Sequence, residues 1–226
     1  MQTIHTDICT KTLLDLAHSM AAPLLEQYTY PWEALPKIGQ FIAQLGPRLS
    51  EQDYLSPRPG VWIHKTAKVA PSAHIGDQVI IGAGTEVRHC AFIRGNALVG
   101  EGAVVGNSTE LKNVILFDRV QVPHFNYVGD SILGFRSHMG AGAITSNVKS
   151  DCSLTTVRLR ELRIETGLKK FGAILGDYVE VGCNTVLNPA TIVGSHTNIY
   201  PLSLVRGYIP GNSIYKHHGE IVTKRP

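Results

Sequence analysis

Large apolar residues recur at every sixth position along a long stretch of this chain. The recurrence runs from Ile63 to Phe117, and a small or β-branched residue stands four positions after each of the first eight. A helix face repeats near 3.6 residues and a half-buried strand near 2, so neither produces a period of six. A stack of triangular coils does, because each flat side holds one six-residue unit with its large residue inside. The pattern therefore predicts an all-β solenoid, a parallel β-helix, with interior residues Ile63, Val69, Ile75, Ile81, Val87, Ile93, Val99, Val105, Leu111 and Phe117.

Interruptions of this period indicate how the chain is organised. The pattern slips by one position at Val122 and again at Leu133, is lost over residues 148–173, and resumes from Leu175 to Val205. The lost stretch is rich in Arg and Lys interleaved with apolar residues, which indicates a protruding loop or hairpin. We therefore expect a β-helix over residues 61–206, with the loop at 148–173, followed by an irregular tail over residues 207–226.

Residues 1–60 have a different pattern, with apolar residues at helical spacing over 11–28 and again from Trp32 to Leu45. A stack of repeats leaves a strand edge and an apolar interior exposed at its end. We therefore expect these residues to form a helical cap over the open end of the first coil.

The amino-acid composition and net charge limit the classes of function that this chain can have. The chain has 226 residues, and its 21 basic and 18 acidic residues give a net charge of +3, which argues against nucleic acid as the main partner. The four cysteines have no paired spacing, and no secretion signal or long apolar run is present. These features predict a cytoplasmic protein that does not enter a membrane.

The coil arithmetic also predicts a binding site. If three units make one coil, residues eighteen positions apart lie above one another, and Arg94 and Lys112 are such a pair. The same count brings Asp130 and Asn147 to that side, with Tyr127 at the adjoining corner. Two cations beside hydroxyl and amide groups suit a phosphorylated, hydroxyl-rich ligand. The alternative is that these are solvated surface residues, as most outward cations are.

Several segments carry a resemblance to a known family. They are VGNSTELK from Val105, HFNYVGD from His124, MGAGAITSN from Met139 and LGDYVEVG from Leu175. Together they resemble the C-terminal acetyltransferase half of the bifunctional glucosamine-1-phosphate acetyltransferase and N-acetylglucosamine-1-phosphate uridyltransferase. The resemblance implies a left-handed β-helix, a homotrimer with active sites between subunits, and acetyl-CoA as acyl donor. Residues 1–60 are too short and too helical for the uridyltransferase half.

The matched positions imply roles for individual residues. His124 falls on the family's general base, a task that suits an imidazole because it titrates near neutral pH. The residues that would bind a sugar phosphate or nucleotide sugar, such as UDP-N-acetylglucosamine, are Arg94, Lys112, Tyr127, His138, Asn147 and Lys170. Those that would line the path of the cofactor are Gly140, Ala141, Gly142 and Cys183.

Three departures from the family bear on the choice of sugar and on cofactor binding. His138 replaces an asparagine of the sugar site, which allows a different amino sugar or a nucleotide sugar. Cys183 replaces a serine near the thioester, and Pro201 removes a backbone N–H that would hold the cofactor arm.

Three further interpretations stay open. A second function hypothesis is a non-catalytic trimer that binds a sugar phosphate or nucleotide sugar but has lost efficient CoA binding. Cys183 as a nucleophile would require a lowered thiol pKa. The histidines do not follow the pattern of the zinc-binding branch of this fold, so we expect no metal requirement.

Overall fold

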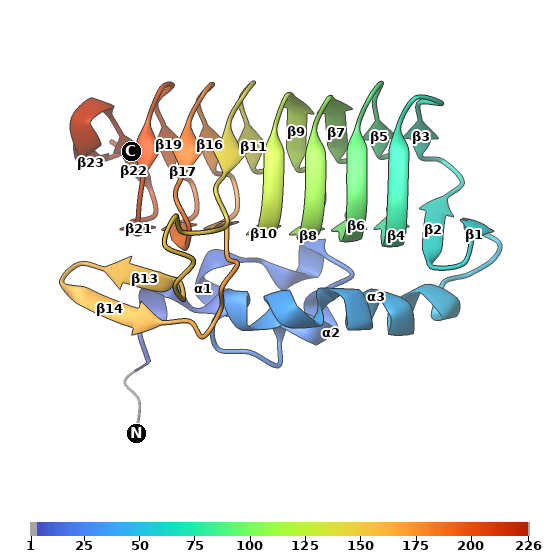
Figure 1. The fold of residues 1–226 in the computed structure, drawn as a ribbon, viewed down its shortest axis with the longest axis horizontal. Helices are drawn as coiled ribbons and strands as arrows, with labels where there is room; N and C mark the ends of the chain where they lie inside the picture. The colour runs from blue at the N-terminus through green and yellow to red at the C-terminus, as the bar shows by residue number, and fades with distance from the viewer. Residues whose placement is uncertain (1–3, 226) are drawn as a thin grey trace.

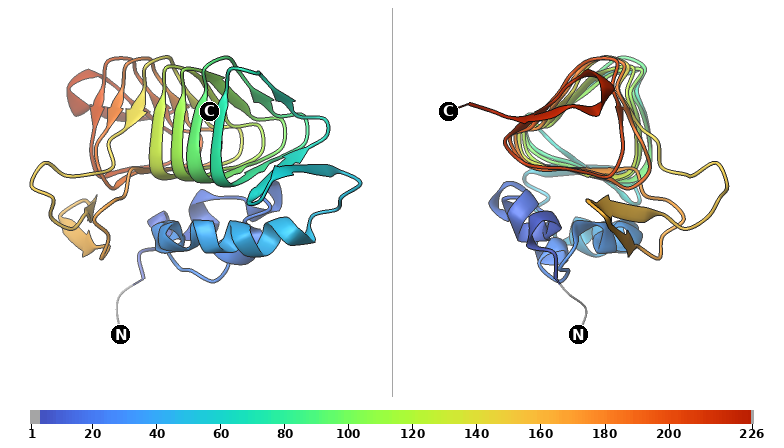
Figure 2. Two further views of the ribbon diagram at one scale, coloured as in Figure 1. Left: turned by 45° about the vertical axis from the view of Figure 1, so that its right-hand side comes forward. Right: turned by 90° about the vertical axis from the view of Figure 1, so that its left-hand side faces the viewer.

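The computed structural model describes residues 4–225 and shows a left-handed parallel β-helix with a triangular cross-section (Figures 1 and 2). The predicted N-terminal cap and C-terminal tail include residues 1–3 and 226, which lie outside the described residues. Three flat sides meet at three corners, and successive strands stack in register along the axis. The fold predicted from the six-residue period is therefore confirmed.

Two sheets form the three sides. The twelve-stranded sheet bends around one corner and supplies sides 1 and 2; its strands are β1 (Tyr54–Arg58), β2 (Val61–His64), β4 (His74–Ile81), β6 (Phe92–Val99), β8 (Glu110–Leu116), β10 (Tyr127–Leu133), β12 (Ile144–Thr145), β15 (Ala173–Leu175), β17 (Val186–Leu187), β18 (Thr191–Val193), β20 (Leu204–Val205) and β21 (Tyr208–Ile209). The nine-stranded sheet forms side 3; its strands are β3 (Lys68–Val69), β5 (Glu86–Val87), β7 (Val104–Asn107), β9 (Gln121–His124), β11 (His138–Met139), β16 (Glu180–Val181), β19 (Asn198–Ile199), β22 (Ser213–Tyr215) and β23 (Ile221–Thr223).

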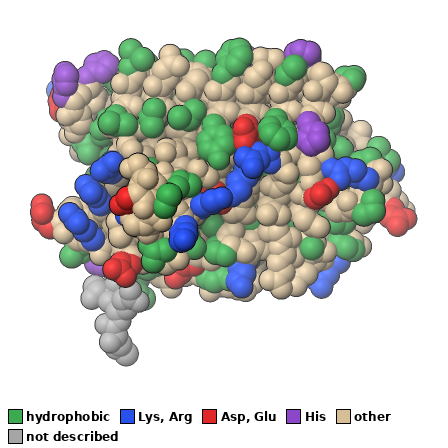
Figure 3. Space-filling model, viewed as in Figure 1, with side chains coloured by type: hydrophobic (Ala, Val, Ile, Leu, Met, Phe, Trp, Pro, Cys, Tyr) green, Lys and Arg blue, Asp and Glu red, His purple; other side chains and the backbone are tan. Residues whose placement is uncertain are grey.

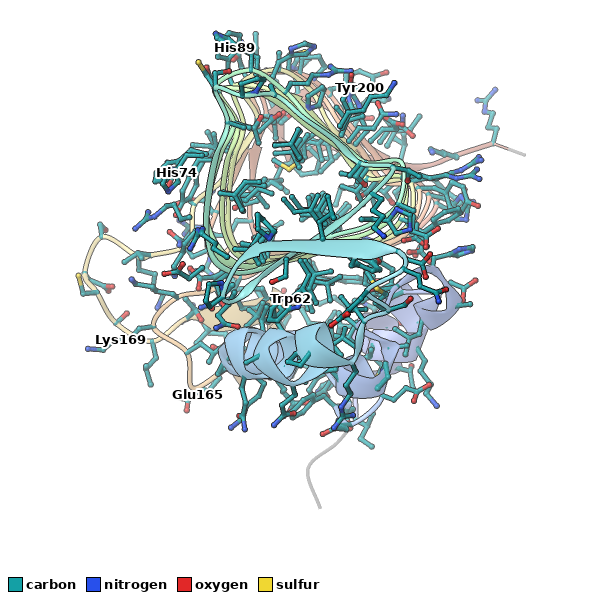
Figure 4. All side chains as sticks on the ribbon, turned by 90° about the vertical axis from the view of Figure 1, so that its right-hand side faces the viewer. Trp62, His74, His89, Glu165, Lys169 and Tyr200 are labelled. Carbon is teal, nitrogen blue, oxygen red and sulfur yellow. The ribbon has the colours of Figure 1, made fainter. Side chains whose placement is uncertain are left out.

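Sides 1 and 2 are distinguished by where the long strands bend. The first residues of β4, β6, β8 and β10 lie on side 1 with β12, β17 and β20, and their last residues lie on side 2 with β2, β15, β18 and β21. Figure 4 looks along the axis and shows His74 on side 1, Tyr200 on side 3 and His89 at the corner between them.

The predicted interior residues fill the triangle. From Ile81 to Phe117, every sixth residue is at most 1% exposed, whereas Ile63, Val69 and Ile75 of the first coils are half-buried. The slip at Val122 is also present, because Val122 pairs with Val105 and Val128 with Leu111. The interior ladder therefore continues through the slip without a gap.

The corners require a left-handed backbone. Asn96, Asn113 and Asp130 have φ values of 50°, 54° and 47° in successive coils at the corner between sides 1 and 2. Asn and Asp tolerate this region better than other residues with a side chain, which explains their presence there.

The N-terminal helices lie along side 2 and do not cover the open end of the first coil, so that part of the prediction is wrong (Figure 2). They are α1 (Thr10–Leu13), α2 (Ala22–Leu25) and α3 (Ile38–Leu45), with 3-10 turns at Thr6–Ile8, Leu16–His18, Pro31–Lys37 and Gly46–Arg48. The edge of the first coil is instead paired by β1, which runs antiparallel to β2.

An apolar stripe on the outer surface explains this position. Alternate residues of a strand face opposite sides of the sheet, so the residue just before each inward residue on side 2 points outward. These outward residues are completely buried: α3 contacts β4, β6 and β8, the 3-10 turn at Pro31–Lys37 contacts β10, and a strand of the inserted loop contacts β18. Trp62 of the first coil lies between the coil and the helices (Figure 4). The stripe consists of Ile80, Leu98, Ile115, Ile132, Ile174 and Ile192.

The loop at 148–173 contains a hairpin, β13 (Thr156–Leu159) and β14 (Leu162–Glu165), which are antiparallel. Val157 is fully buried because β13 packs against β18 and β21 at the end of side 2. The tail is also more ordered than expected: β21 and β22 continue the coil, β23 pairs antiparallel with β22, and a 3-10 turn spans His217–Gly219.

The carboxylate of Asp177 fastens the N-terminal segment to the β-helix. Its two oxygens accept the backbone N–H groups of Asp15 and Phe135, each at 2.7 Å. Burial raises the pKa of Asp177 above its ordinary value of 3.8, and these two hydrogen bonds act in the opposite direction. A raised folded-state pKa favours the protonated folded protein, so this contribution is present below pH 3.8 and is lost as the pH rises through the raised pKa.

We therefore predict two effects of Asp177→Asn. The amide accepts only one N–H well, so the free energy of unfolding at neutral pH should fall by about 1–3 kcal/mol. Urea unfolding of both proteins from pH 3 upward should also show that the advantage of the wild type shrinks as the pH rises. A difference independent of pH would contradict the raised pKa.

Candidate functional site

Asp130, at the corner between sides 1 and 2, is the centre of a polar cluster that extends over side 1, which we call the side 1 cluster. Its carboxylate accepts two hydrogen bonds from the Lys112 ammonium, both at 2.9 Å, and one each from the amides of Asn113 (3.0 Å) and Asn147 (2.6 Å). Asp130 is only 4% exposed. A buried carboxylate is stable only when its charge is compensated, and these donors compensate it.

Arg94 lies on the same face but has its own partner. Its guanidinium contacts the Glu110 carboxylate at 2.9 Å, and this pair is more exposed than the Lys112 pair. The register shifts between Ile93 and Gly95, so that Lys112 pairs with Gly95 rather than with Arg94. The two cations therefore share one side, as the coil arithmetic predicts, although they are not direct register partners. Basic side chains cross the face over β8 and β10 in Figure 3.

Tyr127 completes the cluster. Its hydroxyl oxygen accepts a hydrogen bond from the Asn147 amide at 3.2 Å, and its surroundings include Arg94, Glu110 and Asp130. Burial raises the pKa of Tyr127. The phenol therefore stays neutral at neutral pH, and its own hydrogen is free to be donated to a ligand.

The end of the inserted loop returns to this cluster. The Phe171 N–H donates to the Asn147 carbonyl at 3.0 Å, and the preceding residue, Lys170, is exposed. The structure therefore brings together Arg94, Lys112, Tyr127 and Asn147, and Lys170 lies one residue before this backbone contact with Asn147.

His124 lies on the corner between sides 3 and 1, at the end of β9, and its side chain is exposed. Its carbonyl accepts the Gly142 N–H at 3.0 Å, and the Ala141 carbonyl accepts the N–H of Asn184 at 2.9 Å. His124, Ala141 and Cys183 therefore occupy the same position in successive coils. We call this line of residues, together with Pro201, the His124 corner.

Glycine allows these coils to approach closely. A Cβ on Gly140 would lie 2.7 Å from the Cys183 nitrogen, and Gly142 has φ of +72°. Asn126 ties the coils together, because its buried amide donates to the carbonyls of Gly140 (2.8 Å) and Ala143 (3.0 Å). Ala141 and Gly142, both half-buried, therefore present little side-chain bulk next to His124. We call this stretch of backbone the glycine surface.

His138 lies elsewhere, on side 3. Its Nδ1 is 2.8 Å from the Glu180 carboxylate, and both line a cavity of about 550 Å³ together with Arg119 and Arg136. Within one chain the structure does not place His138 with the Arg94 cluster. The predicted site residues therefore fall on side 1, on the His124 corner and on side 3.

Sequence reasoning missed Glu110, Asn113 and Asn126. Asn113 has a signal in the sequence, since it immediately follows Lys112 and Asn is a residue type favoured at corners with left-handed φ. Asn126 lies inside the HFNYVGD segment, but its contacts depend on the slip between coils. Glu110 gave no signal, because its pairing with Arg94 depends on the local shift in register.

Among residues 4–225, no three His, Cys, Asp or Glu side chains are grouped so that they would hold a metal ion. No helix in the same range is both long and apolar enough to cross a membrane.

Replacing Asp130 tests the cluster directly. Asp130→Ala leaves the Lys112 ammonium without its acceptor and removes one hydrogen bond from each of the amides of Asn113 and Asn147, and we expect a loss of about 2–3 kcal/mol in the free energy of unfolding. Asp130→Asn keeps one acceptor and a residue that tolerates left-handed φ, so its loss should be smaller. Guanidinium unfolding of both variants gives the comparison, and equal losses would contradict the role of the carboxylate.

Two family models match this chain. The family model described as the GMPPB C-terminal domain matches residues 84–201, and the bacterial transferase hexapeptide model (six repeats) matches residues 58–89. The acetyltransferase domain of PglB from Neisseria gonorrhoeae, solved with acetyl coenzyme A, is 20% identical, covers 69% of this chain and 53% of its own, and has a TM-score of 0.32.

Two curated relatives show the same resemblance as the sequence segments. The bifunctional protein GlmU of Methanococcus vannielii is 32% identical over 198 residues, which are 86% of this chain and 48% of that protein. The bifunctional sugar-1-phosphate nucleotidylyltransferase/acetyltransferase of Sulfurisphaera tokodaii is 30% identical over 107 residues, 47% of this chain and 27% of that protein. The chain spans about half the length, or less, of these relatives. Since the family model covers more than half of the chain, this protein belongs to the GMPPB C-terminal domain family of hexapeptide-repeat proteins.

Proposed function

We propose that this protein is an acyltransferase that moves an acetyl or related acyl group from CoA to the amine of a sugar phosphate or nucleotide sugar. The observation that carries the proposal is the cluster on side 1, where two cations, a phenol and an amide are held on one face beside an exposed histidine corner. The name of one relative, a bifunctional sugar-1-phosphate nucleotidylyltransferase/acetyltransferase, supports the same reaction class.

The side 1 cluster would hold the acceptor. Lys170 is exposed, and the exposed Arg94 is paired with the Glu110 carboxylate, whereas Lys112 is held by the buried Asp130. The exposed Arg94–Glu110 pair is weak in water and would open when a phosphate competes for the guanidinium. The Tyr127 hydroxyl and the Asn147 amide are positioned for the sugar hydroxyls.

The His124 corner fits the arm of CoA. Within residues 4–225, the backbone N–H groups of Ala141 and Cys183 make no hydrogen bond, and they lie on successive coils beside the glycine surface. An extended pantetheine arm carries amide carbonyls that such N–H groups would bind. Pro201, next on the corner, has no N–H to donate, so the arm would be held over a shorter length.

The residues of this chain supply proton transfer and positioning. Bound CoA supplies the acyl group as a thioester. The acceptor nitrogen forms a bond to the carbonyl carbon while the carbon–sulfur bond breaks, and His124 removes the proton from the nitrogen and returns it to the departing sulfur. The cations of side 1 would orient the amine, which lowers the entropic barrier to reaction.

A homotrimer would assemble the separated residues. Side 1 and side 3 flank the His124 corner, so packing of copies around this corner would bring side 1 of one subunit toward side 3 of the next. The corner and its margins expose large apolar residues, which supports its role as a contact surface. They are Phe92, Phe125, Tyr200, Leu202 and Leu204.

A second candidate function is a trimer that binds the sugar ligand without catalysis. Pro201 favours it, because the loss of one N–H weakens the hold on CoA. Acyl transfer remains the better candidate, because an exposed histidine beside a glycine surface is not needed for sugar binding alone.

Removing the imidazole should abolish most turnover. We expect His124→Ala to lower kcat by about 10²- to 10⁴-fold in a thiol-release assay with acetyl-CoA and a panel of amino-sugar phosphates and nucleotide amino sugars. The control is His89→Ala, which removes an exposed histidine two coils earlier on the same corner line. Turnover by His124→Ala at the wild-type rate would reject the base, and binding without turnover in the wild type would favour the second function.

The trimer is tested by charge placed on the apolar corner. Phe125 is 61% exposed, so Phe125→Glu should leave the coil folded but disfavour burial of this position between subunits. Sedimentation equilibrium should then show a mass below that of the wild-type trimer. Leu162→Glu, at an exposed position of the hairpin, is the control and should leave the mass unchanged. Equal masses for the wild type and both variants would show that the contact between subunits does not involve Phe125.

A further inference from the structure

Two arginines occupy successive coils on the corner between sides 2 and 3. The Arg119 N–H donates to the Glu101 carbonyl at 2.7 Å, and the Arg136 N–H donates to the Asp118 carbonyl at 3.1 Å, so the two residues lie one above the other. Both side chains are exposed. Across residues 4–225, no carboxylate forms an ion pair with either guanidinium.

An aromatic ring supports both guanidinium groups. The central carbons of the Arg119 and Arg136 guanidiniums lie 6.0 and 5.5 Å from the centroid of the Phe135 ring. That ring is itself fixed, because His18 stacks on it at 3.6 Å and the edge of Tyr178 meets it at 5.5 Å. The contacts limit the freedom of the two arginines while leaving their N–H groups available.

A cavity of about 550 Å³ opens beside the two arginines. It is also lined by Gly102, Gln121 and His138, so hydrogen-bond donors predominate on its wall. Its acidic lining residue is Glu180, whose carboxylate is engaged by His138 at 2.8 Å. The nearby Asp118 carboxylate accepts the Glu101 N–H at 2.8 Å.

We propose that this cavity is a binding site for a diphosphate group. Neighbouring coils are about 4.8 Å apart, a spacing at which two guanidiniums can each bind one phosphoryl group with two N–H···O bonds. Such an anion would relieve the repulsion between two like charges held one coil apart. Two larger ligands carry this chemistry: a nucleoside diphosphate, as in a nucleotide sugar, and CoA.

The site differs from the side 1 cluster in its charge. On side 1 each of the two central cations has a carboxylate partner, whereas Arg119 and Arg136 have none among the described residues. The inference does not depend on acyl transfer, because ligand binding is measured in the absence of turnover.

Calorimetry with inorganic pyrophosphate tests the site in the full-length protein. We expect pyrophosphate to bind the wild type, and Arg119→Gln or Arg136→Gln to weaken that binding by at least tenfold each, since every charge-assisted pair is removed with its hydrogen bonds. Arg48→Gln is the matched control, because it removes one exposed arginine charge from the end of the helical region. Circular dichroism of each variant verifies that the fold is retained.

Titrations with UDP and with CoA identify the source of the diphosphate. The test compares the wild type with a variant that carries both Arg119→Gln and Arg136→Gln. If this variant loses affinity for UDP and retains affinity for CoA, the site belongs to a nucleotide sugar. If it loses affinity for CoA and retains affinity for UDP, the site belongs to CoA. The proposal is overturned if the wild type does not bind pyrophosphate, if the arginine variants bind it as well as Arg48→Gln does, or if neither UDP nor CoA loses affinity. Failure of acyl transfer alone would leave these binding results unchanged.

Discussion

The register between successive coils is the constraint on which the rest of this structure depends. Backbone hydrogen bonds link each coil to the next, so a residue's neighbours are set by the number of residues in one turn. Where the turn has eighteen residues, Ile75 pairs with Ile93; after the slip it has seventeen, and Leu111 pairs with Val128. Because the interior accepts only one large side chain per unit, each slip must preserve the ladder, and it can change only which outward residues meet.

This constraint explains how far the sequence predicts the site. The period of six places Arg94, Lys112, Tyr127 and Asn147 on one face, because outward residues follow the same count as inward ones. It does not predict the partner of each cation, since the shift between Ile93 and Gly95 turns Arg94 toward Glu110. Likewise, the helices were expected at the open end because that end exposes a strand edge and an apolar interior, and the period of six alone does not distinguish one side of the coil from another. Side 2 differs from the other sides because an additional apolar residue, such as Ile80 or Leu98, stands directly before its inward residue, which is every third inward residue of the chain.

Charge is used differently on the two faces that carry cations. On side 1, Asp130 and Glu110 neutralise Lys112 and Arg94, which keeps the face ordered without a ligand and allows the exposed pair to exchange partners. At the corner with Arg119 and Arg136, an aromatic ring contacts both guanidiniums, and among residues 4–225 no carboxylate lies within ion-pair distance of them. Aromatic support orients a guanidinium without reducing its charge, so an anion meets less competition there. Both arrangements hold cations in place, but only on side 1 must a ligand break an ion pair in order to bind.

The insertion at 148–173 shows why a solenoid accommodates new chemistry without losing its fold. The chain leaves side 1 after Thr145 and rejoins the β-helix on side 2 at Ala173, where Ile174 pairs with Ile132 as though the coil had not been interrupted. Since the contacts of each coil involve only its neighbours, the cost of the excursion is confined to one turn. The hairpin recovers part of that cost by burying Val157 against side 2. The returning segment is fastened to the Asn147 carbonyl, so the position of Lys170 is set by the same ladder that orders the core.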